Sequence, residues 1–171
     1  MRSFLIKLII TQFFMLGYSV AASKSAEPTA KASSVIVSNA ADFVAKLPAR
    51  VFVLVSSKTA DEATTRGIES LGPTPNTEFF VLPKESTKPK AIRQGPPVYP
   101  REAGQGKALI MGLIAPTGEV AAVYALAASH PAFATSAAKA VAEWKFKPAK
   151  LKDTAVPVVF VQLIEFNLEM R

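Results

Sequence analysis

Cysteine and histidine, two residue types common in metal sites and in nucleophilic catalysis, are almost absent from this sequence. The chain contains no cysteine and one histidine, His130. Thiolate chemistry and a cysteine-ligated zinc site are therefore excluded, and a histidine-based metal cluster is disfavoured. Asp61, Glu62 and Glu69 fall on or near one expected helix, where a solvated helix face accounts for them better than a pair of catalytic carboxylates. The sequence also lacks a GxSxG motif and a glycine-rich phosphate loop. We therefore expect no enzyme, no metal site and no other cofactor.

The charged residues are mostly basic. The formal net charge is +7, from 20 Lys and Arg against 13 Asp and Glu, and the densest basic run covers residues 84–93. Lys145 and Lys147 flank Phe146 at alternating positions. Solvated charge accounts for these two lysines, and the functional alternative is contact with an acidic partner strand. No basic patch is interleaved with aromatic residues, so we do not expect a nucleic-acid partner.

Residues 1–22 have the features of a secretory signal peptide. Arg2 and Lys7 precede an apolar run that ends in small residues, which is the pattern of an export signal. We predict cleavage after Ala22. The alternative is an uncleaved inner-membrane anchor formed by residues 4–22. The apolar run after Lys7 is shorter than the roughly 20 residues that span a bilayer, and this favours cleavage.

Two segments of different character follow. Residues 23–34 are small and polar, and we expect a flexible leader. Residues 35–83 have the pattern of a small α/β segment, in which helix, strand, helix and strand alternate. These four elements are expected at residues 39–47, 51–55, 59–71 and 79–82. Residues 84–96 are polar, basic and proline-bearing, which predicts a linker.

Residues 97–168 form the next structural unit. The expected order is a short helical turn, two strands joined by a tight turn, a helix and a final strand. The helix begins at Pro131, where the missing N–H costs nothing, and His130 is expected to take a capping or surface position. These elements are expected at residues 100–103, 107–115, 120–127, 131–144 and 156–168.

An aromatic pair marks the end of this Ala-rich helix. Trp144 is the single tryptophan, Phe146 follows two residues later, and Pro148 cannot continue the helix. Packing of both rings into the core is the expectation, with ligand contact as the alternative.

These residues resemble the C-terminal domain of the TonB energy-transducer family. The matching signature consists of Pro97, Tyr99, Pro100 and Ala103, then Gly118 in the hairpin turn, Ala137 and Ala138, then Trp144, Phe146, Pro148 and Ala149, then Pro157. The resemblance implies an α+β fold, in which a small antiparallel three-stranded sheet carries helices on one face. It also implies that Tyr99, Pro100, Gly118, Trp144, Phe146 and Pro148 form a structural core motif.

The resemblance further implies a way of binding. In the family, the last strand lies at the sheet edge and accepts an extended peptide from an outer-membrane transporter. The free N–H and C=O groups of such an edge supply the hydrogen bonds. Carried over here, the accepting strand is residues 158–166, and its partner-binding positions are Val158, Phe160, Gln162, Ile164 and Phe166. Gln162 interrupts the apolar run and is the position best suited to a polar partner.

The partners and the location follow from the same resemblance. It implies a periplasmic protein in TonB-dependent transmembrane transport, bound to an outer-membrane transporter or another envelope protein. The alternative is a non-energised envelope assembly or dimerisation module that uses the same edge strand. We do not expect contact with an inner-membrane motor complex, because His130 lies far from the N-terminus and the leader has a cleavable pattern.

Both faces of the expected sheet are apolar. Along the final strand, Val159 and Val161 lie on one face while Val158 and Phe160 lie on the other. Two apolar faces imply that both are covered. We therefore predict that residues 35–82 either cover or extend the sheet. A homodimer would serve the same purpose.

Overall fold

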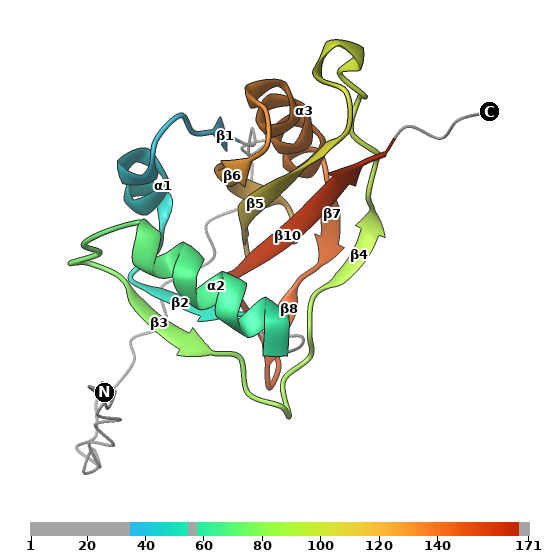
Figure 1. Ribbon diagram of the computed structural model, residues 1–171. Helices are drawn as coiled ribbons and strands as arrows, with labels where there is room; N and C mark the ends of the chain where they lie inside the picture. The colour runs from blue at the N-terminus through green and yellow to red at the C-terminus, as the bar shows by residue number, and fades with distance from the viewer. Residues whose placement is uncertain (1–34, 55–57, 168–171) are drawn as a thin grey trace, which may run out of the picture. The chain divides into compact units, whose positions relative to one another are not determined.

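The computed structural model describes residues 35–54 and 58–167, which form an α+β fold around one six-stranded sheet (Figure 1). The strand order is β1-β6-β5-β10-β2-β3. The predicted signal peptide, its anchor alternative and the predicted leader lie outside the described residues. Within the described ranges, no helix combines the length and the apolar character needed to cross a membrane.

The three central strands all come from the C-terminal part of the chain. They are β5 (Gly106–Ile114), β6 (Val120–Ala128) and β10 (Val158–Phe166). In the turn between β5 and β6, Gly118 has a φ of 88°, which glycine adopts without steric cost. β10 then pairs antiparallel with β5 over its whole length. The predicted three-stranded antiparallel sheet is confirmed as the centre of a larger sheet.

Three shorter strands from the N-terminal segment widen this sheet at both edges. β1 (Val35–Ile36) pairs parallel with β6. At the opposite edge, β2 (Arg50–Val53) pairs parallel with β10, and β3 (Glu78–Val81) pairs parallel with β2. The sheet therefore has six strands, whereas the sequence predicted three. The three additional pairings join distant parts of the chain, and local sequence patterns do not specify such pairings.

Helices cover both faces of the sheet. α3 (Pro131–Ala142) packs on the face that carries Ile110, and α1 (Ala40–Lys46) and α2 (Lys58–Ser70) pack on the face that carries Met111. Neighbouring residues of a strand point to opposite faces, so the apolar run of β5 supplies both cores. The N-terminal segment therefore both extends the sheet and covers its second face.

The start of α3 follows the sequence prediction. Pro131 occupies the first turn, and the Nδ1 atom of His130 accepts a hydrogen bond from the N–H of Ala132 at 3.2 Å. This bond satisfies one of the N–H groups that a helix start leaves without a partner. The predicted capping role of His130 is confirmed.

Two small two-stranded sheets complete the fold. β4 (Lys90–Arg93) pairs with β7 (Lys145–Lys147), and β8 (Ala149–Leu151) pairs with β9 (Thr154–Val156). A short 3₁₀ helix, η1 (Arg101–Ala103), precedes β5. The segment expected to be a linker thus contains the strand β4, which lies beside β7 (Figure 1).

Candidate functional site

The strand expected to accept a partner is β10, and it lies inside the sheet along part of its length. β5 pairs with all of β10 on one side. On the other side, β2 pairs with Val158 and Val159. The open edge therefore begins after Val159 rather than at Val158, because the N-terminal segment supplies a strand that occupies the first two positions.

Hydrogen bonds to β2 identify the groups of β10 that point toward this open side. The N–H of Phe52 donates to the carbonyl of Pro157, and the N–H of Leu54 donates to the carbonyl of Val159, both at 3.0 Å. Successive residues of a strand turn their N–H and C=O groups to opposite sides. The odd-numbered residues of β10 therefore face the open side, and the even-numbered residues face β5.

Residues 161–165 form what we call the free edge of β10. Among the described strands, none pairs with β10 on this side beyond Val159. By the same alternation, Val161, Leu163 and Glu165 present their backbone groups outward. The side-chain amide of Gln162 donates to the carbonyl of Leu163 at 2.8 Å, so one acceptor of the free edge is capped from within the strand.

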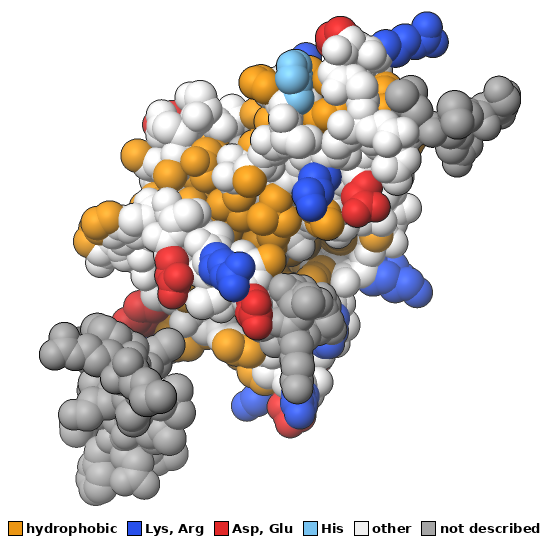
Figure 2. Space-filling model, in the orientation of Figure 1, with side chains coloured by type: hydrophobic (Ala, Val, Ile, Leu, Met, Phe, Trp, Pro, Cys, Tyr) orange, Lys and Arg blue, Asp and Glu red, His pale blue; other side chains and the backbone are white. Residues whose placement is uncertain are grey.

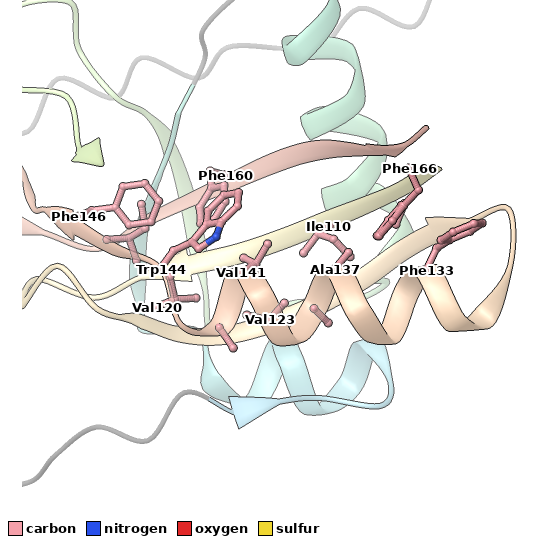
Figure 3. Close-up of a cluster of buried hydrophobic side chains, with 14 residues drawn as sticks. Ile110, Val120, Val123, Phe133, Ala137, Val141, Trp144, Phe146, Phe160 and Phe166 are labelled. Carbon is pink, nitrogen blue, oxygen red and sulfur yellow. The ribbon is translucent and has the colours of Figure 1, made fainter. Parts of the chain in front are cut away.

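The five positions predicted from the sequence divide into two groups. Val158, Phe160 and Phe166 are buried in the hydrophobic core, at 0%, 6% and 3% exposure. Ile164 is half-buried and Gln162 is exposed. Figure 3 shows the rings of Phe160 and Phe166 among the core side chains. Gln162 and Ile164 are therefore the two members of the predicted set whose side chains are not buried.

Sequence reasoning missed Leu163, which presents an outward backbone and a side chain that is 45% exposed. Apolar residues occupy both faces of residues 158–166, interrupted by Gln162 on one face and Glu165 on the other, so the pattern gave no signal for which residues face the open side. The side of β10 on which β2 pairs decides this, and that pairing joins residues about a hundred positions apart.

β10 is bordered by a hollow on each face of the sheet. On the α3 face lies a cavity of about 250 Å³, whose lining includes Ala91, Phe146, Phe160 and Gln162. On the α2 face, Leu163 borders a shallow recess of about 350 Å³. Figure 2 views the α2 face and shows hydrophobic side chains gathered beside α2. A strand added at the free edge would lie beside the cavity that Phe146 and Phe160 line on one face and beside Leu163 on the other.

Trp144 and Phe146 hold the wall of the cavity in place. They are 8% and 9% exposed, and their ring centroids are 6.4 Å apart. The indole N–H of Trp144 donates to the carbonyl of Gly95 at 3.0 Å, which ties the segment before η1 to the core. Figure 3 shows both rings beside Phe160.

The other motif residues fix the ends of the same unit. The hydroxyl of Tyr99 donates to the carbonyl of Gly104 at 2.5 Å. Phe146 donates its N–H to the carbonyl of Gly118 at 2.8 Å, and a Cβ at Gly118 would collide with the carbonyl oxygen of Phe146. The turn therefore needs glycine for close backbone approach as well as for its positive φ.

Two comparisons with known proteins match this unit. The family model described as Gram-negative bacterial TonB protein C-terminal matches residues 95–168. A solution NMR structure of the Pseudomonas aeruginosa TonB CTD is 26% identical, and the match covers 48% of this chain and 89% of that one with a TM-score of 0.40. No curated protein matches the chain. Domains of this family act in TonB-dependent transport, interact with outer-membrane transporters and are periplasmic in Gram-negative bacteria.

Proposed function

Because residues 95–168 match the family model of the TonB C-terminal domain, we propose that this protein binds an extended segment of an envelope protein at the free edge of β10. The partner is an outer-membrane transporter or another envelope protein, and the protein acts after export to the periplasm with cleavage after Ala22. The binding reaction is β-strand addition, in which the partner's backbone hydrogen-bonds to an open strand.

The observation that supports this proposal is the free edge of β10. β2 pairs with β10 at Val158 and Val159 and, within the described ranges, no strand continues that pairing. A row of outward N–H and C=O groups is a template for another strand. At about 3.3 Å per residue, residues 161–165 offer an edge of roughly 16 Å. The partner segment is therefore short, about five residues in contact.

The surroundings of the free edge give selectivity. Side chains of an added strand would alternate between the cavity beside Phe146 and Phe160 and the recess beside Leu163. The recess is mainly apolar, whereas the cavity offers polar and apolar surface in nearly equal parts. Partner side chains on the recess face are therefore expected to be apolar, and those on the cavity face can be polar or apolar, because Gln162 and Phe160 both line the cavity. The amide of Gln162 must leave the carbonyl of Leu163 for the strand to pair there, and it is then free to bind a polar group of the partner.

A proline substitution tests the proposal. Leu163→Pro removes an outward N–H and places a ring where the partner strand would lie, while the hydrogen bonds of β10 to β5 come from the even-numbered residues. We expect the mature protein, residues 23–171, to recover a transporter from solubilised outer membranes. The variant should recover at least about tenfold less. Gln162→Pro is a poorer test, because its N–H faces β5.

Two controls make the result decisive. Leu163→Ala keeps the N–H and should retain most binding, and the thermal unfolding temperature of each variant shows whether the sheet remains folded. Because the chain has no cysteine, Leu163→Cys carries a single photo-crosslinker at the free edge, and Lys139→Cys carries one on α3. Crosslinking to a second copy of the chain at position 163, without any transporter, would replace the transport proposal with dimerisation through the same edge.

A further inference from the structure

β4 and β7 place four cationic side chains on one exposed surface. Their register sets Lys90 opposite Lys147 and Arg93 opposite Lys145. Phe146 points into the core, so its neighbours Lys145 and Lys147 point to the opposite, solvent side. All four cationic residues are exposed. We call them the basic strip. In Figure 2, Lys and Arg side chains protrude along the flank of the molecule where Figure 1 shows β4.

Carboxylates neutralise one end of the basic strip. The Nη2 atom of Arg93 lies 3.6 Å from Glu143 Oε2, and the Nζ atom of Lys145 lies 3.5 Å from Glu119 Oε1. At the other end, no acidic group in the described part of the chain forms an ion pair with Lys90. Lys147, which pairs with Lys90 across the two strands, likewise forms no ion pair with an acidic group of the described residues.

A further lysine extends the end that lacks carboxylates. Thr87 and Lys150 continue the pairing of β4 and β7, with two backbone hydrogen bonds of 2.9 Å. Lys150 is exposed, so Lys90, Lys147 and Lys150 succeed one another along the same ladder. Along the ladder, Lys145 and Lys150 are about 16 Å apart at the rise of an extended strand.

Such an arrangement opposes folding. Like charges directly opposite one another on neighbouring strands destabilise a sheet. Phe146 is the residue of this small sheet that packs in the core. A neutral polar residue at position 90 or 147 would leave that packing unchanged. Positions that break a local rule without helping the fold are where functional contacts are expected.

β4 and β7 form one wall of the cavity beside the free edge of β10, and the basic strip lies on the solvent side of these two strands. Ala91 and Phe146, from the same two strands, line the cavity that Phe160 and Gln162 also line. A segment that pairs with β10 therefore continues past β4 and β7. Glu119 and Glu143 border the strip, which limits it to a few side chains and suits a short acidic segment better than a broad anionic membrane surface.

We infer that the basic strip binds Asp and Glu residues that directly flank the partner segment paired with β10. This inference rests on the proposed function, and it names the chemistry that selects the partner. Backbone pairing carries little sequence information, so an edge by itself accepts many strands. Contact between an acidic flank and Lys90 and Lys147 would favour some of them over others.

Selection from a random peptide library tests this inference. Twelve-residue peptides displayed on phage are selected on the mature protein, on Lys90→Gln/Lys147→Gln, and on Lys46→Gln/Lys139→Gln. The last variant removes the same charge from α1 and α3. We expect Asp and Glu to be enriched beside an apolar core on the native protein and on the control, and to lose that enrichment on the strip variant. Each selected acidic peptide should bind the strip variant about 3- to 10-fold more weakly.

The outcomes separate the inference from the proposed function. Peptides that depend on an intact Leu163 but show no acidic preference overturn the inference and leave strand addition standing. Equal acidic enrichment on the native protein and the strip variant overturns it as well. If the library yields no peptide whose binding Leu163→Pro removes, both fall. Binding of phosphatidylglycerol vesicles that needs Lys90 and Lys147, without acidic peptides, assigns the strip to a membrane surface instead.

Discussion

The two faces of the central sheet are covered in different ways. Beneath α3 lie large aromatic rings in mutual contact, with centroid distances from 4.5 to 6.4 Å: Phe133 with Phe166, Phe160 with Phe146, and Phe146 with Trp144. Beneath α1 and α2 the buried side chains are mostly aliphatic, and Phe43 is the aromatic residue among the fully buried ones there.

The difference lies in where the cover comes from. α3 belongs to the same unit of the chain as the three central strands, so this unit makes one of its cores by itself. α1 and α2 come from the N-terminal segment, which also supplies β2. Covering the second face and closing the first part of the β10 edge are therefore done by one segment. The N-terminal segment thus sets how much of the β10 edge stays open.

Removing the N-terminal segment is the largest test of this contrast. A fragment of residues 95–171 loses the cover of Met111, Leu113 and Val159, which are 0 to 3% exposed in the whole chain. Exposed apolar surface of this kind drives association. We expect a fragment that aggregates or dimerises in size-exclusion chromatography with light scattering. A soluble, folded monomer would show that the second face does not need its cover.

A large-to-small substitution beneath α3 comes next in expected effect. Phe133 is fully buried and its ring stacks on Phe166 at 4.5 Å. Phe133→Ala should lower the free energy of unfolding by about 3–5 kcal/mol, measured by urea denaturation of the mature protein. Phe80→Ala is the matched control, because Phe80 on β3 is 40% exposed, and it should cost about 1 kcal/mol or less. Equal losses would contradict the assignment of the main aromatic core to the α3 face.

Much of the fold could be predicted because most elements carry local signals. The apolar runs, the turn at Gly118 and the prolines at helix starts and ends predicted α1, α2, α3, β2, β3, β5, β6 and β10, with ends within about two residues of those found. β1, β4 and the three-residue strands β7, β8 and β9 were missed. β1 has two residues and β4 is a polar segment with two prolines nearby, so neither has a pattern of its own, and both depend on strands far away in the sequence.

The candidate site was harder to predict than the fold. The sequence located the strand for which binding is proposed, since residues 158–166 are β10. It predicted binding positions on the even-numbered face, and this remains a prediction. That assignment needs the side on which β2 pairs, which follows from tertiary structure alone. The backbone of Gln162 faces β5, while Leu163 faces the open side.

A matched pair of glycine substitutions compares the packing of the two faces. A Cβ at Gly112 would lie 2.5 Å from two atoms of the Phe160 ring, which the core holds rigidly. A Cβ at Gly67 on α2 would lie 2.8 Å from the side-chain ends of Leu126 and Met111, which can turn away. We expect Gly112→Ala to lower the free energy of unfolding by about 1–3 kcal/mol. For Gly67→Ala the gain in helix propensity, about 1 kcal/mol, should offset most of the cost.

Urea denaturation of both variants measures this difference. The helix content of Gly67→Ala, followed by circular dichroism, shows whether α2 remains in place. If Gly67→Ala lowers the free energy of unfolding as much as Gly112→Ala does, the α2 face is packed as rigidly as the α3 face. The two covers would then differ in the part of the chain that supplies them and not in how rigidly they are packed.

The smallest expected effect concerns a buried hydroxyl on α2. Thr64 is 1% exposed, and its Oγ1 atom has no hydrogen-bond partner among the described residues. A buried polar group without a partner loses its hydration without compensation. Thr64→Val keeps the shape of the side chain and removes the hydroxyl, so it should raise the free energy of unfolding by about 1 kcal/mol. Thr64→Ser, which keeps the hydroxyl and loses the methyl group, should lower it. If Thr64→Val instead lowers the free energy of unfolding, the hydroxyl has a hydrogen-bond partner in solution. The α2 cover would then bury no unpaired hydroxyl at this position.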